Sequence, residues 1–409
     1  MKLFIRNLLR NSAFVSRLIR FLLSLPLPVL LARKLISLYL QSESSRPLLE
    51  KSIFRFLDFV SLLPPKDEVT LSKSAIIKAN YGDERGIILV GFEHELDNLL
   101  SCRCSDDVLS KYDILFMPTW QPFYSDSLLR ALKKASDNLY ILPSSENCYY
   151  KAFALPNTFK ALPFHASSWV NPNLYYVAPV KDIDILMVAN FSTYKRHYLL
   201  FEALRDLPSS LKVVLVGRPL AGRTAKDLIE EARAYGVDGR FELIESATNQ
   251  EIVDFLARAK LVLGLSGREG SYVSLAEALF AGAAVGVYAN AHIGTKSYIN
   301  PRTGFLYQND VPLYKQIQQS LDVIETLNPR GWAVENISAH INLQRLNDLM
   351  RFKKHKASIP WTVDCSPFYI QSFQVEPFGE GWSDGIMQEV NRYNKMGLRF
   401  RGQCLKSTA

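Results

Sequence analysis

The feature of the sequence that most constrains the fold is a strand–helix rhythm in its second half. Short apolar runs, each long enough for one buried strand, alternate there with stretches of helical periodicity. Successive strands joined by crossover helices form a parallel sheet with helices on both faces, and ligands bind at the carboxyl ends of its strands. We therefore predict a doubly wound α/β domain. The expected strands are Ile183 to Ala189, Leu211 to Gly217, Phe241 to Ile244, Leu261 to Leu265 and Ala284 to Tyr288, and the expected helices are Arg196 to Leu207, Thr224 to Tyr235, Thr248 to Ala259 and Ser271 to Phe280.

A less regular alternation of strands and helices precedes this domain. Between residues 144 and 180, many Pro, Asn and Ser residues indicate irregular structure and a domain boundary. Within the second domain, Thr248 and Glu251 have the spacing of a helix capping box. The expected strands of the first domain are Gly86 to Gly91, Tyr112 to Pro118 and Leu139 to Pro143. We expect an N-terminal arm at 1–42, a first α/β domain at 43–180, a nucleotide-binding domain at 181–325 and a C-terminal tail at 326–409.

The N-terminal arm is basic and amphipathic. No acidic residue precedes Glu43, whereas seven basic residues do. A helix of this kind lies in a membrane interface, packs on its own domain or serves as a cleaved targeting peptide. The longest uncharged run, Phe21 to Ala32, is shorter than the roughly 20 residues of a membrane span. The basic residues that fall within one arc of about 80° on a helical wheel are Lys2, Arg6, Arg10, Arg17 and Arg20.

Composition excludes several other classes of protein. The net charge is +8, but seven of these charges lie in the arm, so a nucleic-acid-binding body is not indicated. The five cysteines are few, odd in number and scattered, which fits a reducing, cytoplasmic compartment and not a disulfide framework. Cys102 and Cys104 supply half of a zinc site, and no second cluster with matching spacing completes it. We expect no nucleic-acid partner and no metal.

One strand–loop–helix segment carries the groups that best suit a ligand. The strand from Leu261 ends in Ser-Gly-Arg-Glu-Gly, and a helix is expected from about Ser271. The free N–H groups and the positive dipole end of that helix suit a diphosphate. Gly270 lets the backbone approach a ligand closely. Glu269 at the loop tip and Glu277, about two helical turns later, can contact two parts of one extended ligand, such as the hydroxyls of a sugar and of a ribose.

The loops after two earlier strands supply cations. Lys195 follows Asn190 in a strand-to-helix loop and would stand near the same phosphates. Arg218, after the next strand, is a second candidate. A glutamate before a helix is often only a dipole partner, and a lysine in such a loop is usually solvated. Taken singly, these residues therefore do not decide the function.

Taken in order, residues 183 to 307 resemble the C-terminal half of retaining nucleotide-sugar glycosyltransferases with the GT-B fold, of the large family 4 type (glycosyl transferases group 1). The Glu-x7-Glu element from Glu269 to Glu277 is intact, and its context fits on both sides. The N-terminal half matches only in its α/β rhythm. The resemblance implies two doubly wound Rossmann-like domains that face a cleft. The other matching features are Lys195-Arg196, Val216-Gly217, the Glu251 helix, Leu261 to Ser266, Gly270, Gly282, Gly294 and Thr303-Gly304.

The resemblance also implies a role for each site residue. Glu269 would contact the donor-sugar hydroxyls and stabilise positive charge at the anomeric carbon, while Lys195 would neutralise the departing diphosphate. Glu277 would bind the ribose. The backbone of Gly270, Ser271 and Tyr272 would hold phosphate or sugar oxygens. Such enzymes retain anomeric configuration and require no metal or other cofactor, the nucleotide-sugar being a substrate.

The sequence departs from the family in the first loop. Relatives often carry a glycine and an arginine before the lysine, where this chain has Ala189 and Asn190, and its own arginine follows at Arg196. The phosphate clamp is then Lys195 alone or Lys195 with Arg218, and Asn190 is counted with the donor-binding residues. A histidine often lines the cleft in relatives, and His94 and His165 are both candidates. Relatives also suggest that a helix near residues 336–350 crosses back to the first domain.

We therefore expect a hexosyltransferase-type glycosyltransferase that uses a nucleotide-sugar donor and a glycan or lipid-linked acceptor, in polysaccharide biosynthesis. The arm would place it peripherally at a membrane. Two alternatives stay open: a non-catalytic partner protein with a degenerate glycosyltransferase fold, and another sugar-nucleotide enzyme such as an epimerase. The intact Glu-x7-Glu element favours the transferase.

Overall fold

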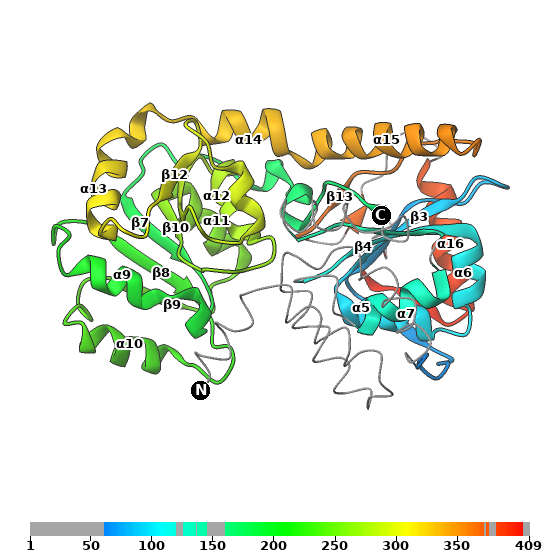
Figure 1. Ribbon diagram of the computed structural model, residues 1–409, viewed down its shortest axis with the longest axis horizontal. Coiled ribbons are helices and arrows are strands. Elements are labelled where there is room, and N and C mark those ends of the chain that lie inside the picture. Colours follow the sequence, from blue (N-terminus) through cyan, green and yellow to red (C-terminus); the bar gives the residue numbers. More distant parts are fainter. Residues whose placement is uncertain are drawn as a thin grey trace, which may run out of the picture.

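The computed structural model describes residues 61–119, 126–135, 137–144, 160–371, 374–375 and 382–403. The N-terminal arm at 1–42, on which the membrane hypothesis rests, lies outside these residues. The described chain forms two α/β halves that stand side by side, each built around its own sheet (Figure 1).

The second half contains a six-stranded parallel sheet in the order β12-β11-β10-β7-β8-β9. This order confirms the doubly wound domain, because the chain fills one side of β7 first and then continues beyond β10 on the other side. The strands are β7 (Ile183–Val188), β8 (Val213–Gly217), β9 (Glu242–Glu245), β10 (Ala259–Gly264), β11 (Ala284–Tyr288) and β12 (Gly304–Tyr307). The helices are α9 (His197–Leu204), α10 (Ala225–Ala234), α11 (Asn249–Arg258), α12 (Val273–Phe280) and α13 (Leu313–Val323).

Local sequence signals explain where several of these helices begin. Thr248 and Glu251 form the predicted capping box, in which each side chain accepts the backbone N–H of the other residue. Thr224 and Asp227 form a second one at the start of α10. The helix predicted from Ser271 instead begins at Val273, because Tyr272 before it is left-handed, with φ 52°. The helix therefore starts two residues later than predicted, and Ser271 and Tyr272 belong to the loop that carries Glu269.

The first half contains a five-stranded sheet in the order β2-β3-β4-β5-β6, which follows the sequence. β2 is antiparallel to β3, and the other pairs are parallel. The predicted strands in this half are confirmed, but β2 was not expected. The strands are β2 (Ser74–Lys78), β3 (Gly86–Gly91), β4 (Tyr112–Met117), β5 (Leu139–Ile141) and β6 (Lys160–Ala161), and the helices are α5 (Glu93–Ser101), α6 (Ser105–Lys111) and α7 (Asp126–Ala135).

The C-terminal segment returns to the first half. Helices α14 (Pro329–Ile337) and α15 (Ala339–Lys356) run along one edge of the molecule from the second half to the first (Figure 1). Leu343, Leu346 and Met350 of α15 pack in the same core cluster as strands β2 to β5. Further along, α16 (Trp382–Lys395) follows the short hairpin of β13 (Phe368–Tyr369) and β14 (Gln374–Val375). β15 (Leu398–Phe400) then pairs in parallel with β1 (Val69–Leu71).

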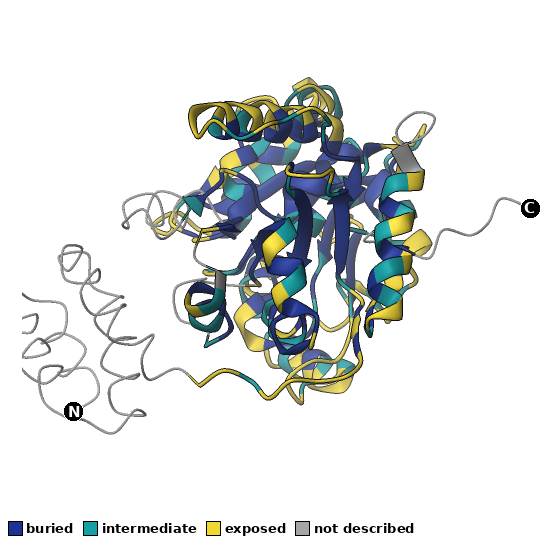
Figure 2. Ribbon diagram, turned by 90° about the vertical axis from the view of Figure 1, so that its right-hand side faces the viewer, coloured by how far each residue is buried: buried dark blue, intermediate teal, exposed yellow. Residues whose placement is uncertain are grey.

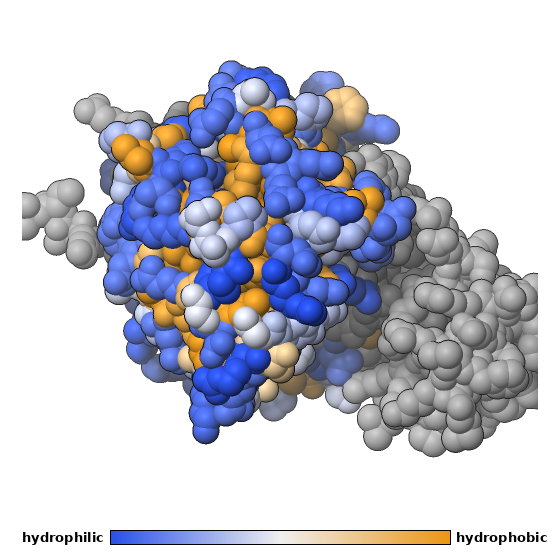
Figure 3. Space-filling model, turned by 90° about the vertical axis from the view of Figure 1, so that its left-hand side faces the viewer, coloured by the Kyte–Doolittle hydropathy of each residue, from blue (hydrophilic) through white to orange (hydrophobic). Residues whose placement is uncertain are grey.

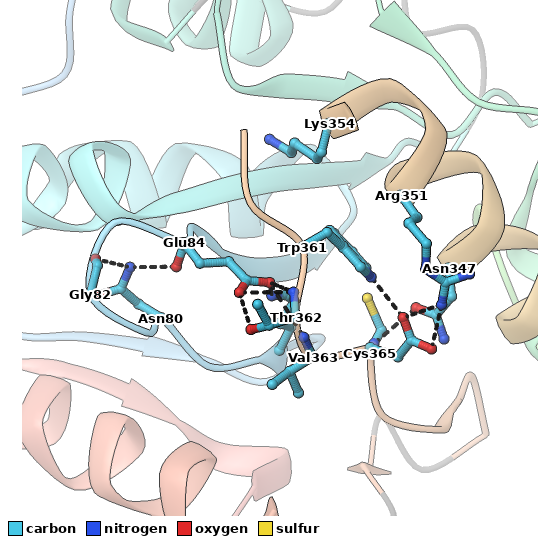
Figure 4. Close-up of polar contacts among 12 residues, drawn as sticks. Asn80, Gly82, Glu84, Asn347, Arg351, Lys354, Trp361, Thr362, Val363 and Cys365 are labelled. Atoms are coloured by element: carbon cyan, nitrogen blue, oxygen red, sulfur yellow. Dashed lines mark hydrogen bonds and ion pairs between the residues drawn. The ribbon is translucent and has the colours of Figure 1, made fainter. Parts of the chain in front are cut away.

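A polar cluster fastens this returning segment to the β2–β3 hairpin (Figure 4). The carboxylate of Glu84 accepts hydrogen bonds from the backbone and side chain of Thr362. It also pairs with Lys78, whose side chain is fully buried and whose ammonium lies 4.6 Å from the Trp361 ring centroid. The Trp361 indole in turn donates to Asp364. The C-terminal segment is therefore an integral part of the first half.

Burial follows the layers of the fold. In the first half, buried strands lie behind helices whose outer faces are exposed (Figure 2). The outer end of the second half presents a mostly hydrophilic surface with narrow apolar strips (Figure 3). Among the described residues, no helix is long and apolar enough to cross a membrane.

Candidate active site

The order of the second sheet brings two distant loops together. β7 and β10 are neighbours, although β8 and β9 lie between them in the sequence. The strand order reverses at this pair, and the carboxyl ends of the strands at such a reversal are where open α/β sheets bind ligands. The loop at 189–196 follows β7, and the loop at 265–272 follows β10. These loops carry Lys195 and Glu269.

Lys195 and Glu269 form an ion pair, with Lys195 Nζ 2.5 Å from Glu269 Oε1. Only 7% of the Lys195 side chain and 12% of the Glu269 side chain are exposed. Ser266 donates a further hydrogen bond to Oε1. Burial lowers the pKa of Lys195, and the nearby Glu269 carboxylate opposes that effect. No described residue donates a hydrogen bond to Oε2, so one oxygen of Glu269 is available to a ligand.

Aromatic rings enclose the Lys195 ammonium. Its Nζ lies 3.9 Å from the ring centroid of Tyr272 and 5.4 Å from that of Tyr194. A desolvated cation over an aromatic face is stabilised by the ring quadrupole. The site thus holds one cation between a carboxylate and two rings.

The other predicted members of the first loop have different roles. Asn190 orders the loop: its Oδ1 accepts the Ser192 N–H at 3.1 Å, and its Nδ2 donates to the Tyr194 hydroxyl at 3.0 Å. The Arg218 side chain is exposed, and no described residue pairs with it. Arg223, which sequence reasoning missed, donates to the Phe191 carbonyl and forms an ion pair with Glu231. Arg218 is therefore the arginine that remains available near this loop.

Gly270 and Gly294 allow the two halves of the molecule to touch. A Cβ atom on Gly270 would lie 2.2 Å from the carbonyl oxygen of Thr119, and one on Gly294 would lie 2.3 Å from that of Ser144. Thr119 follows β4 and Ser144 follows β5, so the carboxyl ends of the two sheets face each other. The close approach expected between Gly270 and a ligand is thus made to the backbone of the first half.

Ser271 and His165 form a polar contact across the same junction. The Ser271 Oγ lies 2.7 Å from His165 Nδ1 and 2.8 Å from the Ser167 backbone nitrogen. Burial lowers the pKa of His165 to about 4, so this histidine is neutral at pH 7. By contrast, 66% of the His94 side chain is exposed. Of the two candidate histidines, His165 is the one that contacts the glutamate loop.

The structure places Glu277 with a different set of residues. Its carboxylate, on the half-buried face of α12, accepts hydrogen bonds from the Tyr175 hydroxyl and from Gln371 Nε2, the latter at 3.4 Å. Burial raises the pKa of Glu277, and these two hydrogen bonds oppose that effect. No hydrogen bond or ion pair among the described residues joins Glu277 to Lys195 or Glu269. In this structure the Glu277 carboxylate is thus engaged by protein groups.

The described residues contain no group of His, Cys, Asp and Glu side chains that could hold a metal ion. Cys102, Cys104 and Cys365 are free, and the first two bring their sulfurs within 2.8 Å of each other on the first half.

Comparisons with known proteins show what this chain is similar to. Residues 176–326 match the family model of the glycosyl transferases group 1, a range that contains both loops of the site. A comparison with curated protein sequences found no match. Among solved structures, the chain is similar to Alr3699/HepE of Anabaena in complex with UDP, at 16% identity over 64% of this chain and 78% of that chain, with a TM-score of 0.51. It is also similar to the sucrose-phosphate synthase (tll1590) of Thermosynechococcus elongatus, at 14% identity over 78% of this chain and 81% of that chain, with a TM-score of 0.51.

These likenesses bear first on the fold. The fold is GT-B, with two Rossmann-like halves, as predicted from the sequence. Residues 176–326 are similar to the glycosyl transferases group 1, and this match and the fold together support a glycosyltransferase.

Proposed function

We propose that the chain transfers a sugar from a nucleotide-sugar donor to a glycan or lipid-linked acceptor, with retention of anomeric configuration. The observation that carries this proposal is the Lys195–Glu269 pair at the reversal of the second sheet. An enzyme that breaks a sugar–diphosphate bond has to stabilise opposite charges at two ends of one bond. A cation and a carboxylate fixed side by side supply both.

Each member of the pair then has a separate task. The diphosphate leaves as an anion, and the Lys195 ammonium would neutralise it. The anomeric carbon becomes electron-poor, and the Glu269 carboxylate would stabilise it while Oε2 accepts a sugar hydroxyl. The backbone at Gly270, Ser271 and Tyr272 would hold further donor oxygens, with Arg218 as the second phosphate ligand. In keeping with the family that the sequence resembles, the proposal includes no metal ion.

Glu277 is proposed to bind the ribose of the donor. A ribose with two vicinal hydroxyls is a suitable partner for a carboxylate whose present donors, Tyr175 and Gln371, are neutral and therefore displaceable. UDP is the first nucleotide to test, since the similar Alr3699/HepE structure contains UDP. The acceptor would bind to the first half, and the basic arm at 1–42 would hold a cytoplasmic enzyme at a membrane surface during polysaccharide biosynthesis.

A thermal-shift screen with UDP, GDP, ADP and their common sugar conjugates tests the proposal. A ligand present at 100 times its dissociation constant stabilises the folded state by roughly 2.7 kcal/mol, which raises the Tm by several degrees. We expect one nucleotide to do so in the wild-type protein and to lose much of its effect in Lys195→Met. If well-folded protein responds to none of the nucleotides, the chain is a non-catalytic partner protein, and the transferase proposal fails.

A further inference from the structure

Tyr272 combines three features at the centre of the candidate site. It is the residue before α12, and its backbone is left-handed, with φ 52° and ψ 62°. Its ring face lies 3.9 Å from the Lys195 ammonium. Its hydroxyl is buried and has no hydrogen-bond partner among the described residues. Each feature affects the free energy of the site, and all three occur in one residue.

The backbone conformation is unfavourable for a tyrosine. A residue with a Cβ atom is strained in the left-handed region, where glycine is the usual residue. The conformation directs the Tyr272 ring down towards the end of β10. A Cβ atom on Gly264 would lie 3.3 Å from Cε1 of this ring, so Gly264 leaves the space that the ring occupies. The fold thus accommodates an aromatic side chain at a position that favours glycine.

The ring accounts for where the Lys195 ammonium lies. Lysine is a flexible point charge, and burying it is costly unless neighbouring groups stabilise the charged form. Glu269 does so from one side and the Tyr272 ring from another, while the Tyr194 ring is more distant at 5.4 Å. Without the Tyr272 ring, the Lys195 side chain could adopt other rotamers. Its ammonium would then no longer be held between the loop after β7 and the loop after β10.

We infer that Tyr272 is a positioning residue for Lys195, whose ring face holds the ammonium at the point where the donor diphosphate arrives. This inference rests on the proposed function for its diphosphate. No covalent step by Tyr272 is involved.

The first measurement needs no nucleotide. In protein labelled with [ε-13C]lysine, the Lys195 methylene signal is assigned by its loss in Lys195→Arg. A ring face 3.9 Å from the ammonium should shift this signal upfield. The shift should persist in Tyr272→Phe, which keeps the ring, and disappear in Tyr272→Leu. Tyr272→Gly provides a second variant without a ring that suits the left-handed backbone, should the leucine variant fold poorly. An unchanged Lys195 signal in both ring-free variants would overturn the inference, whatever the protein binds.

The second measurement isolates the diphosphate. Calorimetry compares UDP with uridine, which lacks the diphosphate. Tyr272→Leu should weaken UDP binding roughly 10-fold, the order expected for a desolvated cation–π contact, and leave uridine binding unchanged. In a Lys195→Met background, Tyr272→Leu should have no further effect on UDP binding, because the Tyr272 ring is inferred to act on UDP only through Lys195. Tyr314→Leu, which removes a ring 6.0 Å from Lys315 on α13, is the matched control.

The outcomes separate this inference from the proposed function. If wild-type protein binds UDP and Tyr272→Leu binds it equally well, the positioning role is wrong and the donor site stands. If Tyr272→Leu weakens UDP and uridine alike, the ring supports the fold of the loop and does not act through Lys195. If no nucleotide binds, the proposed function fails, and the lysine signal still decides the role of the ring.

Discussion

His165 Nδ1 and Ser271 Oγ lie 2.7 Å apart, and this contact joins the segment that leaves the first half to the glutamate loop of the second. The His165 ring also stacks on Tyr298, with ring centroids 5.3 Å apart. The junction between the two halves is therefore built around one buried, neutral imidazole. Its protonation should loosen the junction, which makes the stability of the protein depend on pH.

The first prediction concerns that dependence. The pKa of His165 is about 4 in the folded chain and about 6.5 in an unfolded one, so the unfolded state takes up the proton first as the pH falls. The stabilisation is complete above pH 6.5 and is lost as the pH falls towards 4. Between pH 8 and pH 5 the loss is about 2 kcal/mol from this residue. Urea unfolding at both pH values should show the loss in wild-type protein and a smaller one in His165→Gln.

His94→Gln serves as the control for this experiment, because 66% of the His94 side chain is exposed. Its pH dependence should match that of the wild type. An identical pH dependence of wild-type protein and His165→Gln would mean that His165 is not the titrating group.

The second prediction separates turnover from binding at Glu269. Glu269→Gln keeps the size of the side chain and removes the charge that is proposed to face the anomeric carbon. We expect turnover to fall roughly 10²- to 10³-fold, the usual cost of losing one preorganised electrostatic contact. Nucleotide binding should change much less, because Lys195 remains. Steady-state kinetics and calorimetry on the same preparation measure both, with the exposed Glu245→Gln as control. Full turnover in Glu269→Gln would refute the site assignment.

The third prediction tests the proposed ribose contact. If Glu277 binds the ribose, wild-type protein should bind UDP about 10-fold more tightly than 2′-deoxy-UDP, since a hydrogen bond to a charged group contributes about 1.5 kcal/mol. In Glu277→Ala the two ligands should bind equally. If Glu277→Ala still binds UDP more tightly than 2′-deoxy-UDP, the Glu277 carboxylate only accepts hydrogen bonds from Tyr175 and Gln371 and does not bind the ribose.

The fourth prediction concerns the contact between the two sheets. In Gly270→Ala the new methyl group would lie 2.2 Å from the Thr119 carbonyl oxygen, a backbone atom that cannot rotate away. We expect a loss of about 1 to 3 kcal/mol in stability, or a wider separation of the halves seen by small-angle X-ray scattering. Gly239→Ala, whose new methyl group would meet nothing within 4 Å, should show neither effect. Equal behaviour of the two variants would argue against this close approach.

The fifth prediction concerns the polar cluster of the first half. Glu84→Ala leaves the fully buried Lys78 without its carboxylate, so we expect a loss of about 3 to 5 kcal/mol in denaturant unfolding. The double variant Lys78→Met, Glu84→Gln removes both charges and should recover most of that loss. If the double variant is as unstable as the single one, packing and not charge explains the cluster.

The sequence by itself determined the second half to a large extent. Strand–helix periodicity depends on neighbouring residues, so five of the six strands of that sheet and the Thr248–Glu251 cap could be predicted locally, whereas β12 was not expected. From the sequence, Lys195 and Glu269 were predicted only as a cation and a carboxylate near one ligand, and not as an ion pair. Their loops meet because β7 and β10 are adjacent, which is a property of the sheet order.

Only the tertiary structure decided the rest. The partners of Glu277, the contact of Gly270 with Thr119 and the pairing of β1 with β15 all join residues that are far apart in the sequence. No periodicity reports such contacts, because they depend on how whole layers pack and not on local conformation. The left-handed backbone of Tyr272 is a similar case: its own propensity opposes that conformation, and the packing of its ring at the end of β10 overrides it.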